Sequence, residues 1–108
     1  MSGLLEDGII FFNARRFFDA HEVWEDLWRE SGGPLRLFYQ GLVQTAVGLH
    51  HLSRGNVNGA RAQLSKALAK LEQYPPAFCR INNGKLVADI RAQLEDLLTR
   101  RTIEIVRM

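Results

Sequence analysis

The chain of 108 residues has a single cysteine, few prolines and no long apolar run. One cysteine, Cys79, excludes an intramolecular disulfide framework and favours a reducing compartment. The longest stretch without Lys, Arg, Asp or Glu, residues 37–53, is shorter than the ~20 apolar residues of a membrane span. The N-terminal residues lack the basic segment of a secretory signal and carry Glu6 and Asp7 instead. We therefore expect a cytoplasmic protein without a membrane segment.

An excess of one charge is also lacking, since the formal net charge is +2 and acids and bases are interleaved. Arg100, Arg101 and Arg107 make the C-terminal tail slightly basic, but no aromatic residues alternate with them as on a surface for nucleic acid. Nucleic acid is therefore not an expected partner. The content of 46% hydrophobic and 24% charged residues is that of an ordinary globular protein. We expect one domain over residues 1–108, with a core that needs no metal or disulfide.

Helical periodicity of apolar residues dominates the sequence, and no long run alternates between apolar and polar residues as a half-buried strand would. The pattern predicts five helices: one over about 3–13, one from an N-cap at Asp19 to just before Gly32, one over 34–54, one from an N-cap at Asn56 to Tyr74, and one over 84–101. Residues 102–108, TIEIVRM, are rich in β-branched side chains, and the sequence leaves their conformation open.

A shift of 40 residues aligns two parts of the chain with one another. It places Gly8 on Gly48, Ala20 on Ala60 and Trp24 on Leu64. Small residues at such positions let antiparallel helices approach closely, while large apolar residues fill the inner face. The pattern resembles the tetratricopeptide repeat. We therefore predict an all-α fold, a compact array of two tetratricopeptide-like helical hairpins around a central apolar helix, with a C-terminal capping helix.

The most unusual stretch is FFDAHEVWEDLW, residues 17–28, with one histidine, four acids and two tryptophans. On a helix, Ala20, Trp24 and Leu27 form one stripe, which is expected to face the core. The adjacent stripe carries a histidine and a glutamate four residues apart, His21 and Glu25. A pair at this spacing is either a local structural pair or part of a site.

Metal binding is one interpretation, because His21 and Glu25 can reach one ion, with Glu22 as an additional ligand. The zinc-protease pattern fails, since position 25 is glutamate where a second histidine is needed. The di-iron pattern fails as well, since it needs histidine three residues after glutamate. We therefore expect no metal and no cofactor, and keep His21 and Glu25 as the only candidate ligands.

Polar residues on the third predicted helix extend this stripe into a cluster. Gln40, Gln44 and His51 share one face of an otherwise apolar helix, and buried polar groups need partners. Two arrangements remain open: a closed network that fixes the helix register, or a small cleft with aromatic walls. The candidate cluster comprises His21, Glu22, Glu25, Gln40, Gln44 and His51, and the candidate walls are Phe18, Trp24, Trp28 and Tyr39.

Three blocks of the sequence resemble, in order, the signature of the bacterial and archaeal family called domain of unknown function 309. They are FNARRFFDAHEVWEDLW, FYQGLVQTAVGLHH and RGNVNGARAQLSKAL, within residues 9–72. Asp19 stands where the signature has glutamate. The resemblance implies a small all-helical fold without an assigned activity, and it marks the neighbourhood of His21, Glu25 and Gln44. The matching residues are Phe12, Asn13, Phe17, Phe18, Ala20, His21, Glu22, Trp24, Glu25, Trp28, Gln40, Gly41, Leu42, Gln44, Ala46, Gly55, Asn56, Gly59 and Ala60.

Two classes of function are compatible with this pattern. The first is a non-enzymatic module that binds a protein partner or self-associates, the latter through exposed aromatic residues such as Tyr39, Tyr74 or Phe78. The second is a metal-dependent or acid-base enzyme that uses the His/Glu/Gln cluster, with His21 as a general base oriented by Glu25. The hairpin pattern, and the lack of a nucleophile motif or a glycine-rich phosphate loop, favour the first class.

Overall fold

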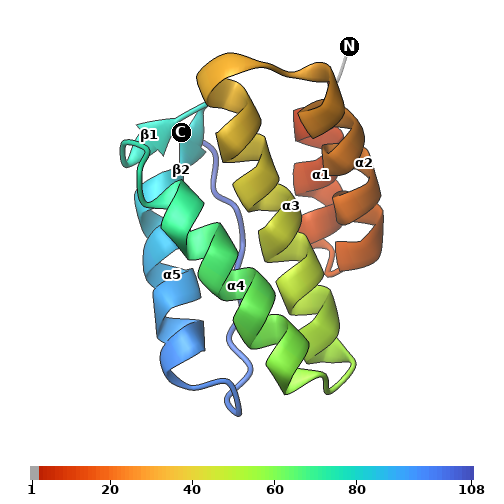
Figure 1. Cartoon of the computed structure of the whole chain (residues 1–108), viewed down its shortest axis with the longest axis vertical. Helices are drawn as coiled ribbons and strands as arrows, with labels where there is room; N and C mark the ends of the chain where they lie inside the picture. The colour runs from red at the N-terminus through yellow and green to blue at the C-terminus, as the bar shows by residue number, and fades with distance from the viewer. Residues whose placement is uncertain (1–2) are drawn as a thin grey trace.

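The computed structural model describes residues 3–108 and contains five α-helices and one short β-hairpin (Figure 1). The elements in chain order are α1 (Leu4–Asn13), α2 (Phe17–Glu30), α3 (Gly33–Ser53), α4 (Val57–Leu71), β1 (Ala77–Phe78), β2 (Ile81–Asn82) and α5 (Asn83–Glu95). The predicted all-α class with five helices is confirmed. Within residues 3–108, no helix is long and apolar enough to cross a membrane.

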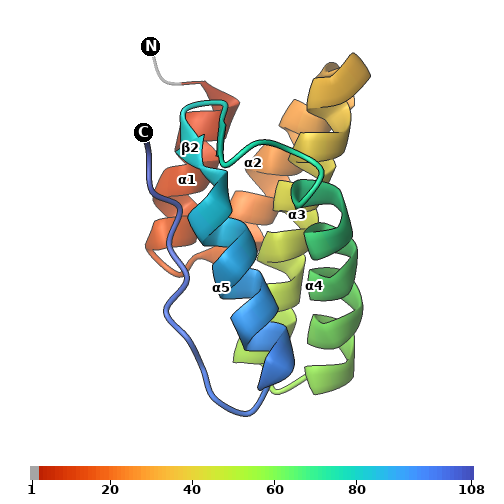
Figure 2. The ribbon, with the colours of Figure 1, turned by 90° about the vertical axis from the view of Figure 1, so that its left-hand side faces the viewer.

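The four first helices pack as successive antiparallel neighbours, so that α3 lies between α2 and α4 (Figure 1). Helix α5 packs on α4, and the C-terminal segment then runs back along the bundle toward the N-terminal end of α1 (Figure 2). The central position predicted for the helix at 34–54 is therefore confirmed. The likeness to the tetratricopeptide repeat in particular stays a prediction.

One apolar core runs through all these layers. Its largest fully buried side chains come from every helix and from the C-terminal segment: Phe12, Trp24, Phe38, Leu42, Leu64, Leu71, Ile81, Leu86, Ile90 and Ile103. Burial at about 25 cal/mol per Å² of apolar surface makes these contacts the main stabilising term of the fold.

Two glycines allow the helices of each hairpin to touch. A Cβ atom on Gly8 of α1 would come within 2.0 Å of the Trp24 indole nitrogen in α2. Forty residues later, a Cβ atom on Gly48 of α3 would come within 2.7 Å of Leu64 Cγ in α4. The predicted pairing of small and large residues at a shift of 40 thus describes two equivalent contacts.

The two hairpins also close in the same way. After α1, the amides of Arg15 and Arg16 donate to the carbonyls of Phe12 and Phe11, at 3.0 and 2.9 Å. After α3, the amides at the equivalent positions 55 and 56 make the same two bonds, at 3.1 and 2.8 Å. This is the Schellman ending, in which one residue adopts a left-handed conformation. Gly55 takes that place in the second hairpin with φ 79°, and Arg15 takes it in the first with φ 67°.

Several predicted helix ends are wrong. Asp19 is not the N-cap of α2, because the helix begins two residues earlier and Asp19 accepts a hydrogen bond from Arg16 at 2.7 Å instead. Helix α4 ends at Leu71 and not at Tyr74. Helix α5 ends at Glu95 and not near 101, because the Asp96 carboxylate binds the amides of residues 98 and 99 and folds the chain into a turn.

The other predicted cap, Asn56, is confirmed, and a cap that was not predicted is found at Asn82. The Asn56 side chain accepts from the Gly59 amide at 2.9 Å and caps α4 as predicted. Asn82 caps α5 in the same way, through the Lys85 amide at 3.0 Å. The hairpin between α4 and α5 was not predicted. Its turn residues, Cys79 and Arg80, have φ values of 52° and 60°, which two-residue turns require but which neither residue type signals.

The C-terminal segment, left open by the sequence, is extended and packs against the bundle. Ile103 and Ile105 are buried, and the Asn82 amide donates to the Val106 carbonyl at 2.7 Å. The Asn13 side chain at the end of α1 donates to the Ile105 carbonyl at 3.0 Å and accepts from the Ile105 amide at 2.8 Å. One side chain therefore holds the segment as a neighbouring strand would.

We expect Gly8→Ala to lower the free energy of unfolding by about 1–3 kcal/mol, because the added methyl group meets the indole ring of Trp24. Gly32→Ala is the control, since a Cβ atom there meets nothing within 4 Å. The control is expected to lose less than about 1 kcal/mol. Urea unfolding measures both; equal losses would contradict the close approach.

We expect Asn13→Ala to lower the free energy of unfolding by about 1–3 kcal/mol, because both bonds to Ile105 are lost. Amide hydrogen exchange of residues 103–107 should accelerate at the same time. Asn58→Ala is the control, since Asn58 is exposed and its side chain only contacts Arg61. Unchanged exchange in the Asn13 variant would show that the segment is held by other contacts.

Candidate functional site

The outer face of α2 carries a row of polar side chains centred on His21. His21 Nε2 lies 2.6 Å from Glu25 Oε2, and Arg29 donates to the other oxygen of the same carboxylate at 3.2 Å. A carboxylate accepts hydrogen bonds, so Nε2 carries the hydrogen. Nδ1 accepts a hydrogen bond when the imidazole is neutral and donates one when it is an imidazolium.

Two contacts define how α2 and α3 face one another. Near the beginning of α2, the rings of Phe18 and His50 are 5.6 Å apart. Near its end, the Arg36 guanidinium lies 4.6 Å from the centre of the Trp28 ring, a cation–π contact. On α3, Gln40 and Gln44 fall between these two contacts on the same helical stripe, at steps of four residues from Arg36.

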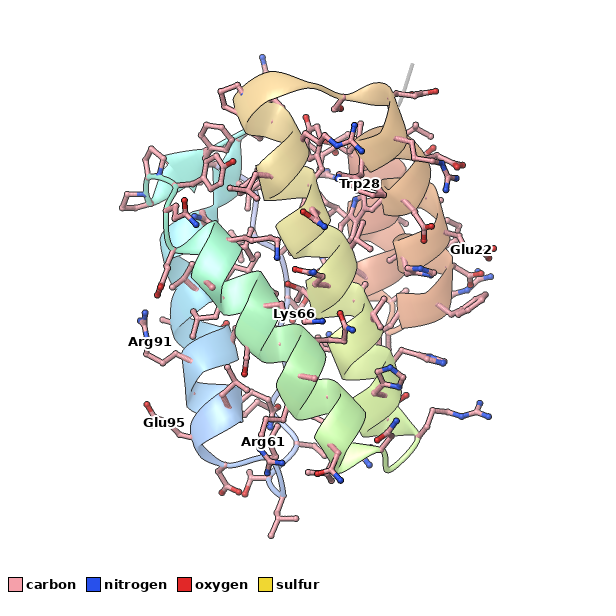
Figure 3. All side chains as sticks on the ribbon, in the orientation of Figure 1. Glu22, Trp28, Arg61, Lys66, Arg91 and Glu95 are labelled. Carbon is pink, nitrogen blue, oxygen red and sulfur yellow. The ribbon has the colours of Figure 1, made fainter. Side chains whose placement is uncertain are left out.

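We call the group His21, Glu25, Trp28, Gln40 and Gln44 the polar seam. It joins the two hairpins along the line where α2 meets α3. Figure 3 shows Trp28 between the two helices and Glu22 on the outer side of α2. Sequence reasoning grouped His21, Glu25, Gln40 and Gln44, with Trp28 as a wall. The two helices that carry them pack against one another, and their use as one site stays a prediction.

Three buried atoms of the polar seam have no hydrogen-bond partner within residues 3–108: His21 Nδ1, Trp28 Nε1 and Gln44 Oε1. The first and the third are acceptors and the second is a donor. Buried polar groups are nearly always satisfied, and an unpaired one costs about 1–3 kcal/mol. These three atoms do not bond one another within residues 3–108, which favours the cleft over the closed network that the sequence left as the other option.

Two hollows adjoin the seam, and His21 lines both of them. The apolar hollow has a volume of about 190 Å³ and is lined by Phe18, His21, Val47, His50 and His51. The acidic hollow has a volume of about 300 Å³ and is lined by His21, Glu22, Glu25, Asp26 and Arg29. The imidazole thus stands between an apolar surface and a carboxylate-rich one.

Two predicted wall residues lie elsewhere. Trp24 is fully buried in the core, where its Nε1 donates to the Leu5 carbonyl at 3.2 Å, and it lines neither hollow. Tyr39 is 8% exposed and lies beside Cys79. Burial raises the pKa of Tyr39 and of Cys79, and the hydrogen bond between them partly offsets this for the thiol. Cys79 therefore has no features of a reactive thiolate.

The remaining predicted residues border the seam. His51 lines the apolar hollow, but its Nδ1 lies 3.3 Å from the Asn56 side chain in the turn before α4. Glu22 lines the acidic hollow and forms no ion pair among those found in residues 3–108. Phe18 is 52% exposed above the apolar hollow, as a wall residue should be.

Three contributors were missed by sequence reasoning: Arg36, Val47 and His50. Arg36 and Val47 lie on the stripe of Gln40 and Gln44, at helical steps, so extending that stripe in both directions would have identified them. His50 was set against His51 as one of two adjacent rings facing different ways. The structure brings both rings to the apolar hollow, with their centroids 6.3 Å apart.

Over residues 3–108, no three His, Cys, Asp or Glu side chains are grouped so that they could hold one ion. His21 and Glu25 already bond one another at 2.6 Å.

The aromatic residues expected to be exposed for self-association are not. Tyr39 is buried, and Tyr74 and Phe78 are half-buried against Phe38, with ring centroids 5.1 and 4.8 Å from it. Large apolar residues that are exposed lie elsewhere: Ile10, Phe18, Leu35, Leu98, Val106 and Met108. That expectation is corrected, because the aromatic rings pack into the end of the core.

Fold and seam together define a class: small all-α proteins of two stacked helical hairpins joined along a histidine-containing polar seam. The sequence profile of the family described as "Domain of unknown function (DUF309)" matches residues 5–72, and the chain belongs to this family. The match spans α1 to α4 and includes the whole polar seam. The predicted family membership is confirmed.

Two relatives in bacteria have similar sequences. An "Uncharacterized protein" of Aquifex aeolicus (strain VF5) is 31% identical over 101 residues, which cover 93% of this chain and 29% of the relative. "Uncharacterized protein YpuF" of Bacillus subtilis (strain 168) is 28% identical over 97 residues, which cover 86% of this chain and 56% of the relative. The chain therefore spans between about a third and about half of the length of these relatives.

We expect Gln44→Met to leave the free energy of unfolding unchanged or to raise it by up to about 1 kcal/mol, because Oε1 has no partner to lose. Gln93→Met is the matched control. The Gln93 side chain is fully buried and donates to the carbonyls of Asp96 and Thr99, so its loss should cost more than about 2 kcal/mol. Comparable losses in chemical unfolding would mean that Gln44 is bonded in solution.

Proposed function

We propose that the protein is a non-enzymatic binding module whose polar seam takes a basic, partly apolar segment of a protein partner. The observation that carries the proposal is His21, which separates the acidic from the apolar hollow and holds an unpartnered acceptor at Nδ1. Together with Gln44 Oε1 and Trp28 Nε1, it leaves two acceptors and one donor unsatisfied. A polypeptide segment supplies both kinds of group.

Charge supports a basic segment. Residues 17–30, which form α2, include five acids and one arginine, in a chain whose net charge is +2. Arg29 already pairs with Glu25 and Asp26, whereas Glu22 has no such partner among the ion pairs of residues 3–108. A lysine or arginine of a partner would pair with Glu22 at the edge of the acidic hollow, and complementary charge also accelerates association.

The apolar hollow supports a partner segment that has an apolar residue next to the basic one. Phe18 is 52% exposed, and the hollow beside it has a volume of about 190 Å³, which suits a side chain and not a drug-sized ligand. Aromatic anchors that fill small pockets contribute most of the energy of many interfaces. The longer chains of both relatives further support a module that is used together with other segments.

Self-association is one form of this proposal, in which the basic segment belongs to a second copy of the chain.

An acid-base enzyme is the second candidate function. It is favoured by the 2.6 Å contact of His21 with Glu25, which orients the imidazole as a general base requires. In that version, Nδ1 accepts a proton from a substrate bound in the apolar hollow.

The proposal is tested by selecting peptides from a random displayed library against the purified protein, and by mapping the best peptide by NMR. We expect the selected peptides to share a Lys or Arg close to a large apolar residue, and to shift the signals of Phe18, His21 and Glu22. Glu22→Lys and Phe18→Ser should each weaken the peptide at least about tenfold, as charge reversal and loss of an anchor do.

Matched controls exist for both variants. Glu95→Lys reverses an exposed acid on α5, far from Glu22 in Figure 3, and Ile10→Ser removes another exposed apolar residue. Both should bind the peptide within about twofold of the unchanged protein. The proposal fails if the selected peptides share no basic residue, or if the controls weaken binding as much as the seam variants. A dimer in sedimentation that Glu22→Lys dissolves would identify the partner as a second copy.

A further inference from the structure

A third hollow shares no lining residue with the two hollows beside the polar seam. It has a volume of about 250 Å³, and we call it the basic hollow. Three arginines surround it, Arg15, Arg100 and Arg101, and its apolar lining includes Phe17, Leu49 and Ile103. Phe17 and Phe18, although adjacent in sequence, line different hollows.

The lengths of the helices explain why this hollow exists. Helix α2 has 14 residues and α3 has 21, and the turn between α1 and α2 ends higher in the bundle than the turn between α3 and α4 (Figures 1 and 2). The last turns of α3 therefore extend beyond the first hairpin. The segment after α5 crosses this step on its way back along the bundle (Figure 2) and forms the other side of the hollow.

The arginines are held in place by the backbone around them. The Arg101 amide donates to Gln93 Oε1 at 3.0 Å, and Gln93 Nε2 donates to the Thr99 carbonyl at 2.7 Å. A fully buried glutamine thus fixes the chain on both sides of Arg100. Arg15 Nη1 donates to the Ile103 carbonyl at 2.6 Å, which ties the opposite side of the hollow to the same segment.

These arginine side chains lack acidic partners. Among the ion pairs of residues 3–108, none includes Arg15, Arg100 or Arg101. Asp96 interacts electrostatically with one of them, Arg101. Hydrogen bonds from Thr99 and Leu98 hold its pKa below the usual value, with a smaller contribution from the charge of Arg101. Asp96 does not line the hollow itself.

Arg15 adds an independent observation, because its backbone conformation is unfavourable for its side chain. It has φ 67°, in the left-handed region, where the equivalent turn of the second hairpin has Gly55. A non-glycine residue in this region is strained, and such strain is concentrated at functional sites. Retaining a long cationic side chain where glycine fits better indicates a use for its charge.

We propose that the basic hollow binds a small organic anion, with its anionic group between the arginines and a short apolar body on Phe17, Leu49 and Ile103. Arginine forms bidentate hydrogen bonds with carboxylate and phosphate groups. Covering the apolar lining removes apolar surface from water, which favours binding. Arg100, Arg101 and Ile103 lie outside residues 5–72, whereas the other lining residues lie within the family match. None of the lining residues belongs to the polar seam, so this site is separate from the proposed function.

The test is an NMR titration of the full chain with octanoate at low ionic strength. We expect saturable shifts at Phe17, Leu49 and Ile103, and weaker binding as salt is added. Octanamide has the same apolar body without the charge, and inorganic phosphate has charge without the body; both should bind at least about tenfold more weakly. Arg100→Gln combined with Arg101→Gln should weaken octanoate at least about tenfold.

Arg61→Gln is the matched control, since Arg61 is an exposed arginine on α4 that does not line the hollow, and it should bind octanoate within about twofold of the unchanged protein. Arg15→Gly keeps the left-handed turn, so it should fold normally while losing affinity for octanoate. The proposal is overturned if octanamide binds as tightly as octanoate, if Arg61→Gln weakens binding equally, or if phosphate alone does as well, which would mean an adventitious ion only.

The same anionic chemistry occurs at the surface of an acidic lipid bilayer. Co-sedimentation with vesicles of phosphatidylglycerol and phosphatidylcholine separates the two sources. Binding of octanoate without binding of vesicles supports a free ligand. The small-ligand site is overturned by two results together: vesicles bind and the double variant of Arg100 and Arg101 abolishes this binding, while octanoate causes no shift at Leu49.

Discussion

The contact of a glycine with a large side chain, made once in each hairpin, is the constraint on which the remaining structure depends. Gly8 receives the indole of Trp24, and Gly48 receives the side chain of Leu64. Each contact brings two antiparallel helices together at a distance that any larger residue would prevent. The first helix of each hairpin also ends in the same Schellman motif, so the two hairpins are built in the same way.

The contact between the two hairpins differs from the contacts inside each hairpin in its buried polar atoms. Inside each hairpin, the contacts are apolar and closely packed, and they satisfy the Trp24 nitrogen through the Leu5 carbonyl. Between the hairpins, His21, Trp28 and Gln44 keep polar atoms buried without partners. Such atoms cost stability, and this cost supports the proposal that the polar seam binds a partner. Acidic residues on α2 and the exposed ring of Phe18 extend the same surface outward.

Much of the fold was predictable, because the period of apolar residues and the glycines at 8 and 48 are local signals. The ends of α2 and α5 were not. Phe17 and Phe18 begin α2 ahead of Asp19 because the turn after α1 is set by backbone bonds, and α5 stops at Glu95 because Asp96 and Gln93 capture the following backbone. The hairpin at Cys79 and Arg80 depends on two left-handed residues that carry no turn signal.

For the site, helical spacing predicted that His21 and Glu25 lie near Gln40 and Gln44 on facing helices, and this grouping stays a prediction. It could not place Trp24 and Tyr39, because an aromatic residue on a helix suits the core as well as a wall. Nor could it find the basic hollow, in which Arg15 lies beside Ile103, 88 positions later in the chain. That contact depends on the tail returning along the bundle, and only tertiary structure contains it.

The central claim is that the polar seam is open and not a closed network. A double-mutant cycle between His21→Ala and Gln44→Ala, followed by urea unfolding of the two single variants and the double variant, tests it directly. Because the two side chains do not bond one another, we expect the coupling free energy to lie within about 0.5 kcal/mol of zero. A coupling above about 1 kcal/mol would contradict the account, since it would mean that the seam is closed by its own hydrogen bonds.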